Sequence, residues 1–557
     1  MNMKINNVLV QHQSIQMRDG INLSADIFIP QDNGKHPTLL IRTPYPRTKE
    51  VDEFNAIDLT RNGWIVVIQN VRGRLGSEGI FNPFIQEIAD GADTIDWCVK
   101  QPWSNSKIVM SGASYVGLTP WLAAIQPSPK ELVGISSHIS SSNVSNDWFF
   151  EGGALRQAFI QSWGLSLVLT DSKASVNHLK IAKIYEKDLV KLYTIPPSES
   201  PLVELLPQYS NWIDLLDKKY WKNIEDPINR TPSTLPRFFI AGWFDFFCEG
   251  TIHDYMESVQ TTNTTVRRNR IIIGPWSHYD VYSQKCGDLD FGVQANGSLE
   301  GIFPELFTWF NNIINDAPTL GGAKVFIMGK NVWHEFPEWP PETSELKLYL
   351  SSINELGTGQ FDNILSKEKQ KEIKSRSFLH DPKNPVPTVG GRTLDPVISF
   401  RAGPVDQRSI ENRADVLTYT SEVLSRDLYV IGLIKAVITF ATSGYSADIA
   451  IKLIDVYPDG KSINIVDSVQ RSRFTPDKKK TITIQVGSTA MMFAKGHRIR
   501  IQISSSNFPH FDLNPSTKIS SLKAKEYKSS RQTIYSGGIK SSYISIPVYE
   551  RFDIINS

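Results

Sequence analysis

The feature that most constrains the fold is a rhythm of short apolar runs that alternate with helix-like segments. Continuous apolar runs occur at 38–41 (TLLI), 64–69 (WIVVIQ) and 107–110 (KIVM). Between the last two lies the segment 86–100, in which apolar residues recur at helical spacing. Apolar strands separated by helices are typical of a parallel sheet that helices cover on both faces. The first part of the chain is therefore predicted to form an α/β core.

This rhythm is interrupted once and then resumes. Residues 143–236 contain amphipathic segments at 155–169 and 176–192 but no clear strand, which indicates a mostly helical insertion. Beyond it the chain returns to apolar runs at 237–241 (RFFIA) and 270–273 (RIII), each followed by a helix-like segment. Because the same pattern lies on both sides, we expect the insertion to interrupt one continuous α/β unit.

After Pro340-Pro341 the pattern changes to strands alone. Short strand-like runs are separated by turns rich in Gly, Pro, Asp and Ser; they lie at 346–350, 428–431, 435–442, 449–456, 481–486 and 499–504. Many short strands without intervening helices predict a β-sandwich or jelly roll. The expected domains are two parts of an α/β core, a helical insertion and an all-β domain, at 1–142 and 237–341, 143–236, and 342–557 respectively.

Length and composition exclude several classes of protein. A chain of 557 residues exceeds the about 250–300 at which a single core stops growing, so several domains are expected. With 59 basic and 58 acidic residues, no excess charge is available to hold nucleic acid or an anionic membrane. No apolar run reaches the ~18 residues of a membrane helix, and residues 1–16 lack the apolar core of a signal peptide. Three cysteines without C-x-x-C spacing fit a reducing compartment, so we expect a cytoplasmic protein.

A candidate nucleophile follows the apolar run at 107–110. The sequence SGASYVG (111–117) comes directly after this predicted strand, and 118–125 is a plausible helix. A serine on a tight strand-to-helix turn, with small residues around it, is typical of a nucleophile elbow. The usual pattern is G-x-S-x-G, whereas here Val116 is the second residue after Ser114 and the glycine follows one position later. Ser114 is the predicted nucleophile, and an ordinary Gly/Ser turn is the alternative.

A serine nucleophile requires a histidine base and an acid that orients the histidine. The run RFFIA leads into GWFD, which ends at Asp245, and the run RIII leads into GPWSH, which ends at His278. Both residues therefore lie just beyond a predicted strand. Together with Ser114 they follow the order serine, acid, histidine that is typical of hydrolases with a nucleophile elbow. The nearest competitors for the histidine are His138, which precedes the acid, and His253, which lies within a predicted helix.

Two groups are candidates for stabilising the oxyanion that forms during acyl transfer. The backbone N–H of Tyr115 follows the nucleophile directly, as the elbow requires. A second donor is expected from the loop after an early strand, which reads RTPYP (42–46). There Tyr45 offers a phenolic donor held between two prolines. A tyrosine that only packs the turn is the other interpretation.

A series of motifs runs in order through nearly the whole chain: RTPYPR (42–47), NVRGRLGSEGIF (70–81), SGASYVG (111–117), GWFDFF (242–247), GPWSH (274–278), PVPTVGG (385–391), GPVDQR (403–408), DVYPDG (455–460) and GHRIRIQISSSNFP (496–509). In these motifs the chain resembles the cocaine esterase-like hydrolases, which are grouped with X-Pro dipeptidyl-peptidases and α-amino acid ester hydrolases. The resemblance implies an α/β-hydrolase core, a helical cap inserted into it and a C-terminal jelly roll. It also implies a catalytic Ser114, Asp245 and His278, with oxyanion donors from Tyr45 and Tyr115.

The same resemblance implies an aromatic acyl pocket. In the cocaine esterase branch, aromatic side chains surround the acyl ring, and the matching positions here are Trp148, Trp163 and Phe247. Plain hydrophobic packing is the alternative for these side chains.

One departure from the family concerns substrates with a free α-amine. The branch that recognises such an amine places carboxylates just after the catalytic acid, whereas this chain has FFC at 246–248. A cation would find no partner there unless Glu249, or Asp147 or Glu151 of the insertion, takes that role. Recognition of an amine, as in an aminopeptidase, is therefore not expected.

Together these observations predict a serine hydrolase that cleaves a small-molecule carboxylic ester through an acyl-enzyme, without a metal or other cofactor. An X-Pro dipeptidyl-peptidase or an amide acylase of the same family is the alternative among enzymes. A binding protein, whose all-β domain holds a glycan beside an inert core, is the alternative of another class. Nucleic acid and membranes are not expected as partners, while assembly into a homo-oligomer stays open. The natural substrate does not follow from the sequence.

Overall fold

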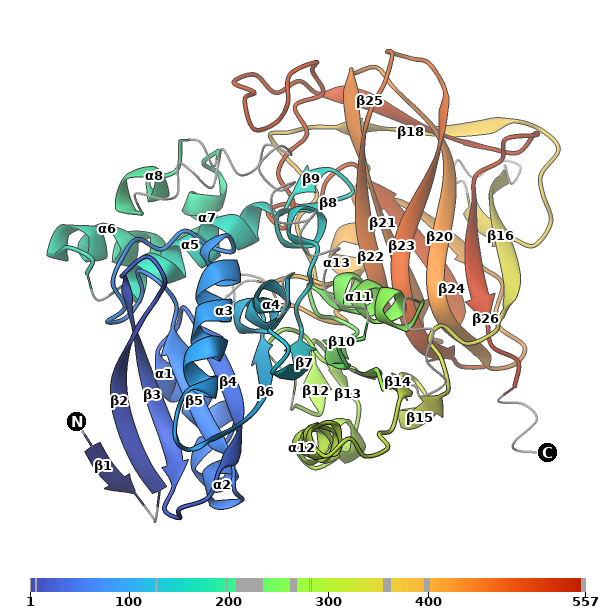
Figure 1. The fold of residues 1–557 in the computed structure, drawn as a ribbon. Coiled ribbons are helices and arrows are strands. Elements are labelled where there is room, and N and C mark those ends of the chain that lie inside the picture. The colour runs from blue at the N-terminus through green and yellow to red at the C-terminus, as the bar shows by residue number, and fades with distance from the viewer. Residues whose placement is uncertain are drawn as a thin grey trace.

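The computed structural model describes residues 2–5, 8–125, 129–171, 173–196, 199–206, 234–260, 268–279, 281, 283–353, 362–394 and 401–551. Figure 1 shows two parts that lie side by side. The N-terminal part is a sheet surrounded by helices, and the regular elements of the C-terminal part are almost all strands.

The α/β core is built on an 11-stranded sheet. Its strands, in spatial order, are β1 (Asn2–Ile5), β2 (Val8–Gln16), β3 (Asn22–Pro30), β5 (Ile65–Asn70), β4 (His36–Thr43), β6 (Ser104–Ala113), β7 (Leu132–His138), β10 (Arg237–Gly242), β11 (Arg270–Gly274), β14 (Gly322–Ile327) and β15 (Val332–Phe336). Neighbouring strands from β5 to β14 run parallel, and the outer pairs are antiparallel. Parallel strands share one carboxyl edge, so the loops that follow them lie on the same side of the sheet.

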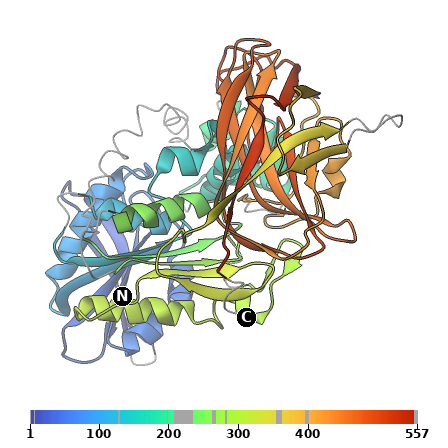
Figure 2. The same cartoon turned by 90° about the vertical axis from the view of Figure 1, so that its right-hand side faces the viewer.

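Helices cover both faces of this sheet. One face carries α3 (Gln86–Val99), α4 (Tyr115–Ala123) and α11 (Cys248–Gln260), and the other carries α1 (Arg47–Glu53), α2 (Ala56–Arg61) and α12 (Ile302–Ile314). In Figure 2 the green α11 lies above the sheet and the yellow-green α12 below it. Successive residues of β5 alternate between the two cores, with Ile65 and Val67 in one and Val66 and Ile68 in the other. A strand buried on both faces has no polar side, which explains its unbroken apolar run.

Between β7 and β10 the chain leaves the sheet. It forms the π-helical turn η1 (Val144–Phe149), the short strands β8 (Phe150–Glu151) and β9 (Ala154–Leu155), and the helices α5 (Gln157–Leu169), α6 (Val176–Lys187), α7 (Leu189–Tyr193) and α8 (Leu202–Leu205). The described part is thus mostly helical, except that β8 and β9 pair as a small hairpin. Residues 207–233 of this predicted insertion lie outside the described residues. After β11 come β12 (Lys285–Cys286), β13 (Leu289–Asp290) and the 3-10 turn η3 (Val293–Ala295).

The C-terminal part is an all-β domain. Its strands are β16 (Ser344–Ile353), β17 (Asp362–Ser366), β18 (Lys374–His380), β19 (Leu417–Ser421), β20 (Leu428–Thr442), β21 (Ser446–Val456), β22 (Ser462–Arg473), β23 (Lys480–Phe493), β24 (Arg498–Ser504), β25 (Ser530–Ser536) and β26 (Tyr543–Val548). A single turn of helix, α13 (Arg408–Glu411), precedes β19. The sheet order is β18-β25-β20-β26-β16-β17-β19-β24-β21-β22, and β23 pairs with β20.

One strand of this domain differs from the sequence prediction. The runs at 428–431 and 435–442, predicted as two strands, form the single strand β20. Gly432 between them has a φ of 125° and pairs with Thr489 of β23, whereas the pairing of β20 with β26 shifts its register between Val430 and Lys435. A bulge of this kind bends a strand without ending it. The glycine signals the irregularity, but the continued pairing depends on β23, which is distant in the sequence.

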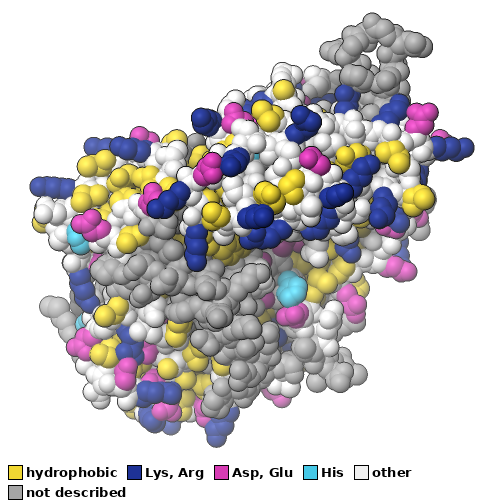
Figure 3. Space-filling view, turned by 90° about the horizontal axis from the view of Figure 1, so that it is seen from above, with side chains coloured by type: hydrophobic (Ala, Val, Ile, Leu, Met, Phe, Trp, Pro, Cys, Tyr) yellow, Lys and Arg dark blue, Asp and Glu magenta, His cyan; other side chains and the backbone are white. Residues whose placement is uncertain are grey.

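The surface carries charges of both signs. Figure 3 shows Lys and Arg side chains over one face with Asp and Glu side chains among them, in keeping with the net charge of +1. Within the described part of the chain, no helix has the length and apolar character needed to cross a membrane. All three cysteines are buried, and none of them forms a disulfide.

Candidate active site

Ser114 lies on a strained turn between β6 and α4. Its φ of 59° and ψ of −125° are unusual for a residue with a side chain. A Cβ at Gly112 would lie 2.3 Å from the Val116 side chain, and a Cβ at Gly117 would lie 2.8 Å from the Gly112 carbonyl oxygen. The turn therefore needs glycine at both positions. The glycine that comes one residue later than in G-x-S-x-G is the one that packs against the strand end.

Asp245 and His278 lie in two loops that are hydrogen-bonded to each other. The parallel register of β10 and β11 pairs Gly242 with Gly274. The ladder then continues, because the Trp243 N–H donates to the Gly274 carbonyl at 2.8 Å and the Phe244 N–H donates to the Trp276 carbonyl at 3.0 Å. Two neighbouring strand ends thus carry the acid and the histidine side by side.

The acid and the histidine form a close pair. His278 Nδ1 lies 2.7 Å from Asp245 Oδ2, and the Phe247 N–H donates to Asp245 Oδ1 at 2.7 Å. The Asp245 side chain is fully buried, whereas the His278 side chain is 8% exposed. With both of its oxygens engaged and no access to water, Asp245 is held in one orientation and fixes the imidazole ring.

The order of the strands brings the three predicted residues to one edge of the sheet. Ser114 follows β6, Asp245 follows β10 and His278 follows β11, and only β7 separates β6 from β10. β7 also supports the turn directly, since the His138 carbonyl accepts the Ser114 N–H at 3.0 Å.

The two competing histidines have other roles. The buried His138 ring contacts the Ser136 hydroxyl at 2.7 Å, and burial lowers the pKa of His138 to about 3, so the ring is neutral at ordinary pH. His253 lies on α11 with 62% of its side chain exposed, beside Glu257. Among the described residues, neither imidazole is paired with a buried acid as His278 is.

Two candidate oxyanion donors flank the serine turn. Tyr115 is the first residue of α4, where backbone N–H groups lack partners within the helix. Its side chain is anchored, because the hydroxyl donates to Glu87 and accepts the Phe84 N–H. Tyr45 accepts a hydrogen bond on its hydroxyl oxygen from Trp163 Nε1 at 3.1 Å. Burial raises the pKa of Tyr45 to about 12, so the phenol keeps its proton and can donate it.

The loop that carries Tyr45 is held by two residues that the sequence analysis did not single out. The Asn70 side-chain amide donates to the Tyr45 carbonyl at 2.8 Å. The buried Arg74 guanidinium donates to the Pro44 carbonyl and to the Leu167 carbonyl on α5, both at 3.0 Å. Arg74 thereby joins this loop to the insertion. Both residues belong to the motif at 70–81, and this motif is the sequence feature from which their role could have been suspected.

The predicted pocket residues form one aromatic cluster beside the site. The Trp148 ring lies 4.5 Å from the Phe247 ring, which lies 5.7 Å from the His278 ring. The Tyr115 ring contacts Trp148 at 6.4 Å and Trp163 at 6.1 Å. Trp148, Trp163 and Phe247 are all buried. The cluster therefore packs against both the Tyr115 ring beside the serine turn and the His278 ring, and it makes the surroundings of the site apolar.

Three carboxylates near this cluster already have partners. Glu249 pairs with Arg392 at 2.6 Å, and Glu151 pairs with Arg156 at 2.8 Å. Asp147 accepts a 2.6 Å hydrogen bond from the Ser141 hydroxyl, and burial raises its pKa. Burial also raises the pKa of Glu151, to about 7. These are the carboxylates that could replace the missing partners of an α-amine, and each is already engaged.

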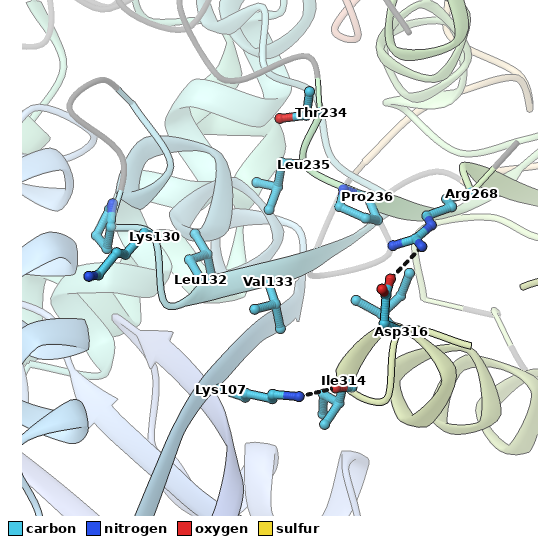
Figure 4. Close-up of a pocket in the computed structure, with 12 residues that line it drawn as sticks. Lys107, Lys130, Leu132, Val133, Thr234, Leu235, Pro236, Arg268, Ile314 and Asp316 are labelled. Atoms are coloured by element: carbon cyan, nitrogen blue, oxygen red, sulfur yellow. Dashed lines mark hydrogen bonds and ion pairs between the residues drawn. The ribbon is translucent and has the colours of Figure 1, made fainter. Parts of the chain in front are cut away.

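A separate pocket lies at the opposite edge of the sheet. It has a volume of about 470 Å³ and is lined by residues at the amino ends of β7, β10 and β11, among them Leu132, Leu235 and Arg268. Figure 4 shows the ion pair between Arg268 and Asp316 beside it. Active sites of parallel sheets lie at the carboxyl edge, so this pocket is not part of the site.

Comparison with known families adds independent information on this site. A family model described as X-Pro dipeptidyl-peptidase (S15 family) matches residues 19–280. A second, described as X-Pro dipeptidyl-peptidase C-terminal non-catalytic domain, matches residues 315–545. Together the two matches span most of the chain. The chain belongs to the S15 family. The first match contains Ser114, Asp245 and His278, which thus lie outside the domain described as non-catalytic.

Individual proteins are similar to the chain over nearly its whole length. Cocaine esterase from Rhodococcus sp. (strain MB1 Bresler) is 29% identical over 574 residues, covering 96% of this chain and 98% of the esterase. Two solved structures each align with a TM-score of 0.78 over 98% of this chain and 97% of the other. One is an aminopeptidase from Thaumarchaeota archaeon, at 25% identity, and the other an α-amino acid ester hydrolase, at 26%. These matches confirm the resemblance to the cocaine esterase-like hydrolases and the α/β-hydrolase fold with a C-terminal all-β domain. This S15 member is a serine hydrolase.

Proposed function

We propose that this S15 member cleaves carboxylic esters of small molecules, with Ser114 as nucleophile, His278 as general base and Asp245 as the acid that orients it. The observation that carries the proposal is the 2.7 Å contact between His278 Nδ1 and Asp245 Oδ2, at the sheet edge where the strained Ser114 lies. Because Asp245 occupies Nδ1, the other ring nitrogen, Nε2, is left to accept a proton.

The reaction would follow the two steps of acyl transfer. His278 Nε2 takes the Ser114 proton as Oγ attacks the ester carbonyl carbon, and the carbonyl oxygen becomes an oxyanion. The Tyr115 N–H and the Tyr45 O–H donate to this oxyanion. Its collapse expels the alcohol, which leaves with the proton from His278, and Ser114 keeps the acyl group. Water, deprotonated by His278, then releases the carboxylic acid and restores the serine.

Labelling with a fluorophosphonate separates this proposal from the binding-protein alternative. The reagent reacts with activated serines, so Ser114 should be modified and the label should be found on the peptide that contains it. A panel of p-nitrophenyl esters set against Gly-Pro-anilide then distinguishes an esterase from a dipeptidyl-peptidase. A chain that takes up no label and cleaves no ester would support an inert core.

We further propose that the acyl group is neutral, and preferably aromatic or branched. Phe247 packs against the His278 ring and Trp148 packs on Phe247, so the surroundings of His278 are apolar, and an unpaired ammonium group buried there would cost several kcal/mol. Glu249, Glu151 and Asp147 are engaged with groups of the chain itself. The similarity to an aminopeptidase provides the contrasting case. A substrate with a free α-amine needs a carboxylate partner in the pocket, whereas a neutral acyl group needs none.

Neutral acyl esters should therefore be cleaved with a kcat/KM on the order of 100-fold higher than esters that bear a free α-amine. The measurement compares the two acyl series at one pH with leaving groups of matched pKa, so that only the acyl side differs. Faster cleavage of the amine series would overturn the proposal and direct attention to Asp147, Glu151 and Glu249.

Trp163→Phe should lower kcat by about 3–10-fold with little change in KM. The Trp163 N–H donates to the Tyr45 hydroxyl oxygen, so the phenolic proton is not used in this hydrogen bond and can be donated to the oxyanion. Loss of one such hydrogen bond is worth about 1 kcal/mol. In a Tyr45→Phe background the effect should vanish, because the hydroxyl it acts through is gone. The kinetic constants of the two single variants and the double variant measure this coupling.

Trp148→Phe is the matched control for this coupling. It removes an indole N–H from the same aromatic cluster, but that N–H donates to the Ser141 carbonyl at 2.9 Å rather than to Tyr45. Its effect should be the same whether residue 45 is Tyr or Phe. If the effect of Trp163→Phe also persists undiminished without the Tyr45 hydroxyl, Trp163 acts only through packing.

We place the domain limits at 142, 236 and 341, and the changes of element type near these positions support them. We place the protein in the cytoplasm, which three buried cysteines without a disulfide support. The reaction as proposed uses side chains and backbone groups of the chain alone.

A further inference from the structure

One arginine of the all-β domain contacts the loop that carries Asp245. Arg392 follows the motif PVPTVGG (385–391), and its side chain is only 7% exposed. Its Nε donates to the Trp243 carbonyl at 2.9 Å and its Nη1 donates to the Glu249 carboxylate at 2.6 Å. Its Nη2 donates to the Ser488 carbonyl on β23. All three guanidinium nitrogens are therefore engaged, two of them on the α/β core.

The two contacts of Arg392 with the α/β core lie on either side of Asp245 in the sequence. Trp243 lies two residues before Asp245, in the segment that is hydrogen-bonded to the histidine loop, and Glu249 lies four residues after it, in the first turn of α11. Glu249 also accepts the Ser488 N–H at 2.5 Å and the Ser488 hydroxyl at 3.0 Å. The acid loop is thus attached to the all-β domain on both sides of Asp245.

The all-β side of the contact is shaped to admit a guanidinium. Gly487, before Ser488, has a φ of 129°, and a Cβ there would lie 2.6 Å from Arg392 Nη1. Gly391 has a φ of 93°, and a Cβ there would lie 2.7 Å from the Asp467 carboxylate. That carboxylate accepts a hydrogen bond from the Arg392 backbone N–H at 3.2 Å, which connects the arginine backbone to β22. Gly487 therefore leaves room for the guanidinium, and Gly391 leaves room for the carboxylate that holds the arginine backbone.

We propose that Arg392 is a positioning residue for ester hydrolysis: from the all-β domain it holds the acid loop so that Asp245 stays within hydrogen-bonding distance of His278. This inference rests on the proposed function. A displacement of about 1 Å in a reacting constellation can lower the rate by ~10²-fold, so a contact outside the site can control turnover. The all-β domain then contributes to the rate without touching the substrate.

Arg392→Met tests this positioning, because methionine keeps much of the side-chain length and removes every donor. We expect kcat per fluorophosphonate-reactive site to fall about 10–100-fold and KM to stay within about threefold. The second readout is the downfield proton on the ring nitrogen of His278 that faces Asp245, observed by NMR with ¹⁵N-labelled histidine. Its signal should weaken or shift in the variant. This proton can also be followed in the Ser114→Ala protein, so the contact is tested even if ester hydrolysis is not the reaction.

Arg471→Met is the matched control. Arg471 is another arginine of the same domain, with 15% of its side chain exposed, and pairs with Asp448 at 2.8 Å and Asp512 at 2.9 Å, without contact to the acid loop. Its loss should lower thermal stability as much as that of Arg392, yet leave kcat and the His278 proton unchanged. This comparison separates positioning of the acid from general destabilisation.

Glu249→Gln provides a second test that leaves Arg392 in place. Glutamine keeps the shape of the side chain but removes the charge that pairs with the guanidinium. We expect a smaller fall in kcat in the same direction, and no further loss when it is combined with Arg392→Met. If both variants match Arg471→Met in kcat and retain the His278 proton signal, Arg392 only holds the two domains together and the proposal is wrong.

Discussion

Ser114→Ala is expected to lower kcat/KM for ester hydrolysis by roughly 10⁴–10⁶-fold, because a serine, histidine and acid that act as a unit lose nearly all activity when one is removed. The change deletes one hydroxyl from a partly exposed turn and no core volume. The fold should therefore persist, and thermal unfolding should occur close to the wild-type temperature. Hydrolysis of a p-nitrophenyl ester and fluorophosphonate labelling measure the loss.

Ser111→Ala is the control for this prediction. Ser111 lies three residues earlier at the end of the same strand, is fully buried, and has no part in the proposed reaction. Its loss should change kcat/KM by no more than a few-fold. More than a few per cent of wild-type activity in Ser114→Ala would remove Ser114 from the mechanism.

Tyr45→Phe is expected to lower kcat by about 10²–10³-fold, with little change in KM. The phenol is partly buried and keeps its proton, its oxygen accepts the Trp163 N–H, and its proton is the group proposed to donate to the oxyanion. Removing one oxyanion donor typically costs about 2.7–4 kcal/mol of transition-state stabilisation. Because the donor acts on charge that develops only in the transition state, the loss appears in kcat. Steady-state kinetics with one neutral ester measure both constants.

A buried tyrosine outside the site provides the comparison. Tyr255 lies on α11 against Phe239, and Tyr255→Phe should leave kcat close to the wild-type value. An unchanged kcat in Tyr45→Phe would show that Tyr45 only packs in the turn and does not stabilise the oxyanion. The oxyanion would then depend on the Tyr115 N–H and on a donor elsewhere in the site.

Much of the architecture followed from local patterns. Burial on both faces of a parallel strand produces an unbroken apolar run, so β4, β5, β6, β10 and β11 could be predicted from the sequence. Ser114, Asp245 and His278 could be predicted as the catalytic residues because each lies in the loop after such a run, and the structure places Asp245 and His278 in contact. The division of β20 was predicted wrongly because a glycine breaks the local pattern without breaking the pairing.

The sequence by itself determined which elements form, their order along the chain, and which residues follow the strand ends. The tertiary structure decided which side chains meet. Trp163 reaches the Tyr45 hydroxyl from the insertion, and Arg392 reaches Glu249 from the all-β domain. A periodic pattern records how a residue is oriented within its own strand or helix. Contacts between residues more than a hundred positions apart depend on how whole elements pack, and no local pattern contains that geometry.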